Sequence, residues 1–154
     1  MNPIVPLNLP KTELKLSRIA DEIWVNCLIR KKKIILTPEE WVRQHFIAFL
    51  TDHLGFPIAR IAVEKSIQYG SLTKRWDILV YDHQFNPLIL IECKAPSISI
   101  NKDTLYQALT YQKEMQGRFI LLTNGQDHSI FEVDVENQQF IEQREFPRNE
   151  SLII

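Results

Sequence analysis

Apolar and polar positions along the chain follow two spacings, which separate the predicted strands from the predicted helices. Polar and apolar side chains alternate over residues 13–19, which predicts a first strand. Residues 23–29 fit a strand and a helix equally well. From Val42 to His53 the apolar positions recur three or four residues apart, so this stretch is expected to form a helix whose apolar face lies on a sheet.

Residues 37–40, with the sequence Thr-Pro-Glu-Glu, predict where this helix begins. Thr37 is a favourable N-cap, Pro38 suits the first helical position, and Glu40 at the third position can close a capping box. The helix is expected to run to about Leu54 and to stop at Gly55, because glycine commonly follows the last turn of a helix.

The rest of the chain alternates between strand and helix patterns. We expect a long strand, two strands joined by a hairpin turn, a helix and two final strands at residues 58–69, 74–80, 88–96, 101–115, 118–123 and 130–135. A helix, a three-stranded meander, a second helix and two further strands predict the α/β fold class, with a mixed β-sheet core flanked by helices.

The composition is that of one globular domain. The 154 residues are 45% hydrophobic and 24% charged, which supplies enough apolar side chains for a real core. We expect a single domain over residues 1–154, with its core at about residues 13–146 and short tails at residues 1–11 and 147–154.

The sequence carries no membrane or export signal. No apolar run approaches the roughly 20 residues needed to span a bilayer, and residues 1–4 lack the basic-then-apolar order of a secretion signal. The protein is therefore expected to be cytoplasmic and to have no membrane partner. Its two cysteines form neither a disulfide framework nor a zinc-ligand pattern.

The net charge of the chain limits the class of binding partner but does not decide it. A net charge of −1 argues against a strongly basic nucleic-acid binder, but an acid-rich site would lower the total and leave a local basic patch elsewhere. The basic run at residues 30–33 fits a solvated turn, which is the commoner case, and also fits a phosphate contact.

Three polar residues interrupt the two central apolar strands, Asp77 in the first and Glu92 and Lys94 in the second. Side chains in a strand alternate faces, so Glu92 and Lys94 are expected to project together while Cys93 points the other way. A hairpin between the strands brings all three polar groups to one sheet edge. Two carboxylates and one ammonium on one surface indicate a divalent-cation site.

The segments around these residues resemble the PD-(D/E)XK nuclease superfamily and, more narrowly, the N-terminal nuclease domain of the type I restriction enzyme endonuclease subunit. The resemblance covers roughly residues 23–135 and implies a restriction-endonuclease-like fold. One position departs from the family signature, because Trp76 stands where the signature has proline before the aspartate. The segments that carry the resemblance are residues 36–44, 75–80, 91–96 and 123–125.

The resemblance implies a role for each polar residue. Asp77 corresponds to the central metal-binding aspartate and Glu92 to the second carboxylate ligand, and the backbone carbonyl of Cys93 is expected as a further ligand. Lys94 corresponds to the lysine that orients or activates the attacking water, or offsets charge on the phosphate. Glu40 corresponds to a helix-borne acid that contacts the metal through water. The expected cofactor is Mg²⁺ or Mn²⁺, which takes oxygen ligands.

Five further residues are candidates for positioning the substrate. Gln107 and Tyr111 lie four residues apart on one helix face and resemble a Gln-x-x-x-Tyr motif found in a subset of these nucleases. An amphipathic surface helix would explain the same pair. Arg43, Lys74 and Arg75 flank the acids and are candidates for phosphate contacts, although a solvated charge is the default for each.

The resemblance thus implies a Mg²⁺-dependent endonuclease acting on DNA phosphodiester bonds. The sequence contains no G-x-x-x-x-G-K-[ST] loop, so we expect neither ATP binding nor an ATPase motor. Cutting both strands needs two active centres, which makes a homodimer or other restriction-system subunits the expected partners besides DNA. The alternative function is a catalytically silent nucleic-acid-binding or assembly module that retains the nuclease scaffold.

Overall fold

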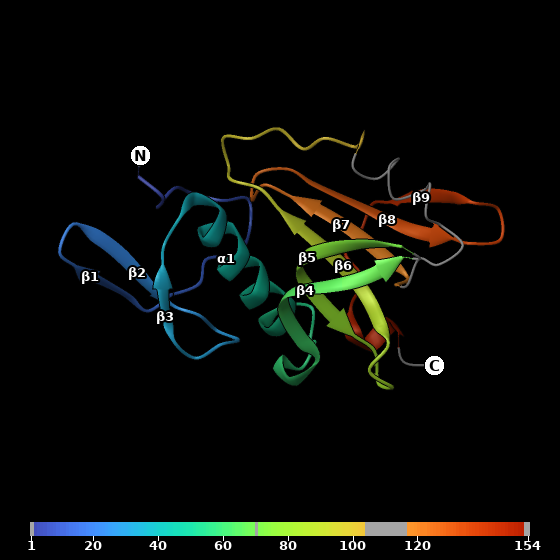
Figure 1. Cartoon of the computed structure of the whole chain (residues 1–154), viewed down its shortest axis with the longest axis horizontal. Coiled ribbons are helices and arrows are strands. Elements are labelled where there is room, and N and C mark those ends of the chain that lie inside the picture. Colours follow the sequence, from blue (N-terminus) through green and yellow to red (C-terminus); the bar gives the residue numbers. More distant parts are fainter. Residues whose placement is uncertain (1, 70, 104–116, 153–154) are drawn as a thin grey trace.

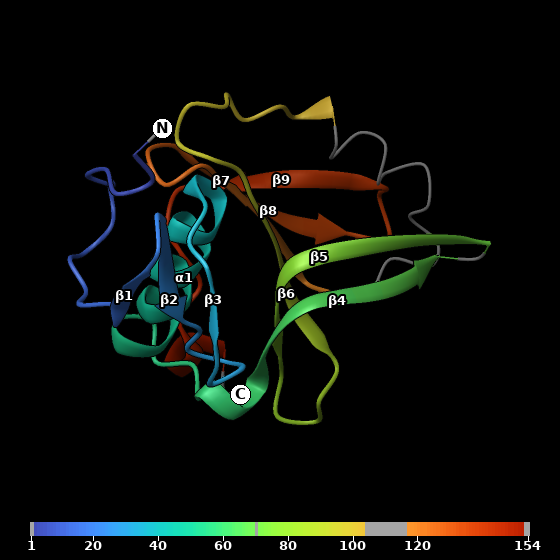
Figure 2. The same cartoon turned by 60° about the vertical axis from the view of Figure 1, so that its left-hand side comes forward.

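The computed structural model describes residues 2–69, 71–103 and 117–152. In these residues a helix, α1 (Pro38–Asp52), lies between a small three-stranded sheet and a six-stranded sheet (Figures 1 and 2). The predicted helix at residues 101–115 falls largely outside the described residues, and so do Gln107 and Tyr111. None of the helices described is long and apolar enough to span a bilayer.

The six-stranded sheet forms the larger part of the fold, and its strand order follows the chain order. All neighbouring strands are antiparallel except β6 and β7, which are parallel. The sheet is therefore mixed, which confirms the predicted α/β fold class with a restriction-endonuclease-like core. Its strands are β4 (Ile61–Tyr69), β5 (Leu72–Tyr81), β6 (Pro87–Cys93), β7 (Phe119–Thr123), β8 (His128–Asp134) and β9 (Gln139–Gln143).

Helix α1 begins where the sequence predicted. The backbone N–H of Glu40 donates to Thr37 Oγ1 at 3.0 Å, which confirms Thr37 as the N-cap. The helix ends at Asp52, slightly before the predicted Leu54, and Gly55 follows with a φ of +79°. The long strand expected from residue 58 begins only at Ile61, because residues 58–60 form a 3₁₀ turn, η1 (Ile58–Arg60), after Pro57.

The six-stranded sheet has an apolar core on each face. On the face toward α1, Val42, Phe46 and Leu50 of the helix pack against strand residues. The opposite face carries a second core around Trp76 and Leu90. Because β6 is buried on both faces, the two cores meet along it and hold it rigidly. Strand residues of the first core include Ile78, Val80, Ile89, Ile91, Cys93 and Leu121, and those of the second include Leu79, Ile120, Leu122 and Phe131.

The small sheet consists of β1 (Leu16–Ile19), β2 (Glu22–Asn26) and β3 (Lys33–Ile35), paired antiparallel in that order. Residues 23–29, which fitted a strand and a helix equally well, therefore contribute to a strand. The basic run at residues 30–33 covers the turn between β2 and β3 and the first residue of β3; Lys31, Lys32 and Lys33 are exposed, and Lys31 has a φ of +57°. These three lysines thus lie in and beside a solvated turn.

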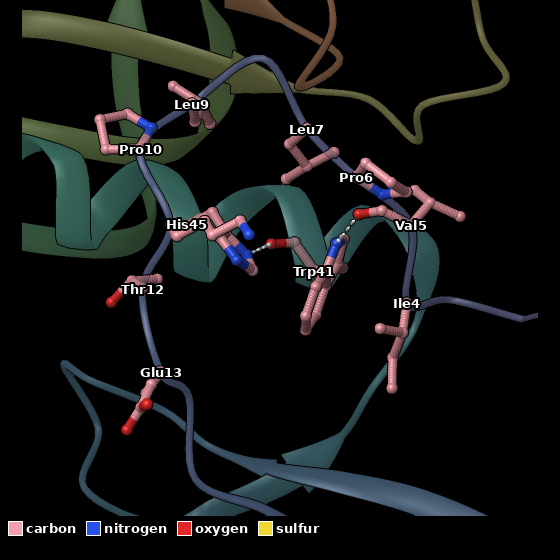
Figure 3. A pocket seen from close by; sticks show the side chains of 11 residues that line it. Ile4, Val5, Pro6, Leu7, Leu9, Pro10, Thr12, Glu13, Trp41 and His45 are labelled. Carbon is pink, nitrogen blue, oxygen red and sulfur yellow. Dashed lines mark hydrogen bonds between the residues drawn. The ribbon is translucent and has the colours of Figure 1, made fainter.

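The segment before β1 runs along α1 and ties the helix to the turn between β7 and β8. Trp41 Nε1 donates to the Val5 carbonyl at 2.8 Å (Figure 3), and the Asn8 N–H donates to the Gly125 carbonyl at 2.8 Å. Gly125 has a φ of +84°, and a Cβ there would lie 2.7 Å from Leu7. A glycine is therefore required for this close approach.

At the C-terminal end of the described chain a 3₁₀ turn, η3 (Asn149–Leu152), lies beside the end of α1. The Asn149 N–H donates to the Leu54 carbonyl at 2.9 Å, and Arg60 Nη2 donates to Asn149 Oδ1 at 2.6 Å. Arg60 is buried, so this bond satisfies a charged group that has little access to water.

Candidate active site at a strand fork

Asp77 and Glu92 occupy facing positions on β5 and β6, at the point where the two strands separate. Their ladder ends with the pair Ile78 and Ile91, and each acid is the next residue beyond that pair. From there β6 stays paired with β7 as far as Cys93 and Thr123. Figure 2 shows the β4–β5 hairpin turning away from β6 beyond this point, which we call the fork.

The Asp77 carboxylate lies between the separating strands. Its Oδ2 accepts a hydrogen bond from the Cys93 N–H at 2.7 Å, in place of the backbone acceptor that a continued ladder would supply. Its Oδ1 lies 3.9 Å from Arg43 Nη2 on α1. The side chain is 18% exposed, so it retains some access to solvent. Asp77 is thus held at the fork by one backbone bond and faces the helix.

The Glu92 carboxylate makes a different set of contacts. Glu92 pairs in register with Leu122, whose side chain belongs to the core on the face away from α1. Its Oε1 lies 2.7 Å from Lys74 Nζ, which in turn lies 5.2 Å from the centre of the Trp76 ring. The Glu92 side chain is 14% exposed. Glu92 is therefore already paired with a protein cation through Oε1.

Lys94 lies one residue beyond the end of β6 and is exposed. Its backbone N–H donates to the Thr123 carbonyl at 2.8 Å. Burial and the charge of Asp77 raise the pKa of Glu39 at the start of α1, while the charges of Arg43 and Lys94 act to lower it. Because the regular alternation of β6 ends at Cys93, it does not fix the face on which Lys94 lies.

Arg43 is buried on α1, with 8% of its side chain exposed, and carboxylates surround it. Burial acts to lower the pKa of its guanidinium, but Glu40 and Asp77 outweigh that effect and leave the pKa above its ordinary value. The sequence made Arg43 a candidate for phosphate contact, whereas its guanidinium already faces protein acids. The four contacts run to Glu39 at 3.5 Å, Glu40 at 3.5 Å, Glu64 at 3.3 Å and Asp77 at 3.9 Å.

Glu40 belongs to the same group of charges. Its Oε2 accepts from Gln44 Nε2 at 3.0 Å and lies 3.5 Å from Arg43 Nε. Gln44 also accepts from the Leu28 N–H at 3.0 Å, so these residues join α1 to the loop after β2. The sequence expected Glu40 to close a capping box and to contact a metal through water. Its carboxylate contacts Gln44 and Arg43 of its own helix, and the contact with a metal through water stays a prediction.

Sequence reasoning missed Glu64, and it made Lys74 a candidate for a phosphate contact without predicting that Lys74 pairs with Glu92. Glu64 is a strand residue with a φ of +52°, and its carboxylate contacts both Arg30 and Arg43. The hydrogen bond from Arg30 is the main reason that the pKa of Glu64 is lowered. Neither residue belongs to a motif, and single charged residues at strand positions give no sequence signal.

The donor set at the fork fits a largely hydrated hard cation and no closed metal site. Within residues 2–69, 71–103 and 117–152, no group of three or more His, Cys, Asp or Glu side chains could hold a metal ion. Burial raises the pKa of the Cys93 thiol well above its ordinary value, and Asp77 adds to this effect, so the thiol stays protonated. The available donors are two partly exposed carboxylates, which suffice for Mg²⁺ because it keeps several waters.

A polar hollow of about 370 Å³ lies just beyond Lys94. Its walls include the segment after β6 and the turn after β7, and Asn124 Nδ2 joins the two by donating to the Ile98 carbonyl at 2.8 Å. Polar residues that line the hollow include Ser97, Ser99, Lys102, Gln126 and Ser129.

Arg75, the other arginine predicted to contact phosphate, is exposed on β5, where it pairs in register with Ser66.

The chain matches the model of a known protein family. The model of the type I restriction enzyme R protein N terminus matches residues 38–147, well over half of the chain. The match begins at the first residue of α1 and includes the whole six-stranded sheet. A comparison with curated protein sequences found no match.

Proposed function

The chain belongs to the family of type I restriction enzyme R protein N-terminal domains, and from that membership we propose that it hydrolyses DNA phosphodiester bonds with the help of a divalent cation. The observation that carries the proposal is that Asp77 and Glu92 each lie one residue beyond the last pair of the β5–β6 ladder. Their side chains leave the fork in different directions, Asp77 toward Arg43 on α1 and Glu92 toward Lys74. Both acids sit at the ends of buried strand segments, where an unpaired carboxylate is costly unless a cation or donor accompanies it.

Asp77 and Glu92 are the residues that would hold Mg²⁺ or Mn²⁺, with the Cys93 carbonyl as a further oxygen donor. Such an ion supplies Lewis acidity and makes bound water a better nucleophile. Lys94 is exposed beside the fork and would stabilise negative charge that develops on the phosphate. In this proposal Glu40 acts through Arg43 and Gln44, which order the helix side of the site.

DNA would reach the fork from its exposed side. Arg75 and Lys102 are exposed cations available for phosphate contacts, and serine hydroxyls line the hollow beyond Lys94. Gln107 and Tyr111 would position the substrate, as the resemblance implies. We propose that the protein works in the cytoplasm, without ATP, as a homodimer or with other subunits of a restriction system.

A second function is a catalytically silent module that binds DNA or organises a restriction complex. One observation favours it: both acids already have protein partners, Glu92 with Lys74 and Asp77 with the Cys93 N–H. Because protein groups already pair with both carboxylates, the fold does not need a cation at this position. If this function is correct, the protein binds DNA and does not nick it.

Plasmid cleavage separates the two functions. Purified protein is incubated with supercoiled plasmid and Mg²⁺ or Mn²⁺, and the nicked and linear forms are quantified. The nuclease proposal expects cleavage by the parent protein and a loss of at least about 100-fold in Lys94→Ala, because electrostatic stabilisation of the transition state is removed. Lys15→Ala is the matched control, since this exposed lysine lies beside the small sheet and outside the fork, and it should cut nearly normally.

Two results would contradict the nuclease proposal. A parent protein that binds plasmid but leaves it supercoiled with both metals, alone and with cognate restriction subunits, would support the silent module. Cleavage that persists undiminished in Lys94→Ala would show that a different centre, or a contaminant, performs the reaction. Circular dichroism of each variant establishes that the fold is intact.

A further inference from the structure

Glu64 is held in a backbone conformation that side chains other than glycine rarely adopt. Its φ of +52° lies within β4, and not at a turn. The pairs on either side of it are Val63 with Ile78 and Lys65 with Trp76, so Glu64 lies opposite Asp77 in the ladder. Strained residues of this kind cluster at functional sites, where the surrounding structure must enforce them.

At this position in both β4 and β5, the side chains that faced α1 give way to side chains that face the other side of the sheet, which we call an exchange of faces. In β4, Ile61 and Val63 pack in the core toward α1, whereas Ile67 packs in the core on the other face. In β5, Ile78 belongs to the first core and Trp76, two residues away, belongs to the second. Regular alternation would keep residues two positions apart on one face. The exchange therefore occurs at Glu64 and Asp77.

This exchange lets both carboxylates reach Arg43 on α1. Glu64 Oε1 lies 3.3 Å from Arg43 Nη1, and Asp77 Oδ1 lies 3.9 Å from Arg43 Nη2. The second Glu64 oxygen accepts from Arg30, which comes from the turn before β3. Arg43 Nε is buried and makes no hydrogen bond to any described residue, so the carboxylates that contact Nη1 and Nη2 hold the guanidinium in its direction.

The distances from Arg43 to its four carboxylates show that Asp77 is the least closely paired of them. Of the four carboxylates around Arg43, Glu64 is the nearest and Asp77 the most distant. A guanidinium paired fully with Asp77 would compete with any cation for that carboxylate. Glu64 gives the guanidinium a nearer partner, and Arg30 holds Glu64 in place.

We propose that Glu64 is a positioning residue of the fork, which holds Arg43 back from Asp77 and so leaves Asp77 free to bind a divalent cation. The inference rests on the proposed function, because it assigns Asp77 to a metal. It explains why a glutamate occupies a position where glycine would remove the backbone strain: the carboxylate is needed there.

The first test is Mn²⁺ binding, measured by electron paramagnetic resonance or calorimetry. Glu64→Gln removes the charge and keeps the side-chain shape, while Glu64→Gly also removes the strain and so should stay folded. Both variants should bind Mn²⁺ at least about tenfold more weakly, the usual effect of removing a group that orients a metal ligand. Adding Arg43→Gln to Glu64→Gln should recover much of the affinity, because the competing guanidinium is then gone.

A matched control is available on the same sheet. Glu132 pairs with Arg118 at 3.3 Å in an exposed position of β8, so Glu132→Gln removes a comparable ion pair outside the fork. Its Mn²⁺ affinity should equal that of the parent. Equal affinity in Glu64→Gln, or a further loss when Arg43→Gln is added, would overturn the role of Glu64 as a restraint on Arg43.

A second test works without any metal and separates this inference from the proposed function. Unfolding of the parent, Glu64→Gln, Asp77→Asn and the double variant forms a double-mutant cycle. Removing Asp77 should destabilise the Glu64→Gln protein more than the parent, because Arg43 then depends on Asp77. Additive effects would refute the inference even in a protein that binds Mn²⁺, whereas a parent without Mn²⁺ binding would count against the proposed function alone.

Discussion

At the scale of single residues, the fork depends on which charges pair with the two acids. Asp77 keeps its place through the Cys93 N–H, while Glu92 is engaged by Lys74 at 2.7 Å. Lys74 is therefore a competitor for any cation that uses Glu92. Sequence reasoning identified both acids, because carboxylates in apolar strands are conspicuous. It could not identify Lys74 as the competitor, because that pairing depends on side-chain directions at the fork.

Replacing Lys74 tests this competition. Lys74→Met keeps the packing against Trp76 but removes the ammonium, so Glu92 becomes available. A partly exposed ion pair is worth up to about 1 kcal/mol, and Mn²⁺ should therefore bind up to about fivefold more tightly. Titration of both proteins with Mn²⁺ measures the change. Weaker binding in Lys74→Met would mean that Lys74 supports the site and does not compete for it.

At the scale of helices and strands, features set by neighbouring residues in the sequence were predicted better than features set by contacts between distant segments. The start of α1 was predicted because Thr37 and Pro38 act on the adjacent turn, and the capping bond is present. The strand at residues 58–69 was predicted three residues too long at its start, because Pro57 leads into a 3₁₀ turn. The face exchange at Asp77 could not be predicted, since it depends on the backbone of Glu64 on another strand.

The same contrast applies to the directions of the side chains at the candidate site. Alternation predicted that Cys93 faces the first core with Ile89 and Ile91, as observed. It also predicted that Glu92 and Lys94 project together, which requires the strand to continue past Cys93, where β6 ends. Periodicity therefore predicts the face of Cys93 correctly, whereas the directions of the site side chains depend on where each strand ends and on the charges brought by α1.

At the scale of the whole molecule, the segment before β1 connects α1 with the β7–β8 turn and lies beside two histidines, of which His45 is buried and His128 is half-buried. His128 Nε2 lies 3.0 Å from the Asn8 carbonyl, and its Nδ1 lies 2.7 Å from Thr123 Oγ1. His45 Nδ1 lies 2.8 Å from the Trp41 carbonyl (Figure 3). His45 helps to line a cavity of about 620 Å³ beneath the segment. Burial lowers the pKa of both histidines.

These histidines predict that acid destabilises the protein. A histidine whose pKa is lower in the folded state binds its proton more readily when unfolded, so its contribution to stability is present above the unfolded pKa of about 6.5 and is lost as pH falls below it. The melting temperature should therefore drop between pH 7.5 and pH 5.5. His128→Gln should show a smaller drop, and an equal drop in both proteins would contradict this role for His128.

The central claim is that Asp77 and Glu92 share one divalent cation at the fork, and crystals of the parent protein soaked in Mn²⁺ test it most directly. Anomalous diffraction should give a peak between β5 and β6, at roughly 2.0–2.6 Å from an oxygen of each carboxylate, as for oxygen-ligated divalent cations. Lys74 should have moved away from Glu92. A fork without a peak at saturating Mn²⁺, with Lys74 still bound to Glu92, would contradict the account.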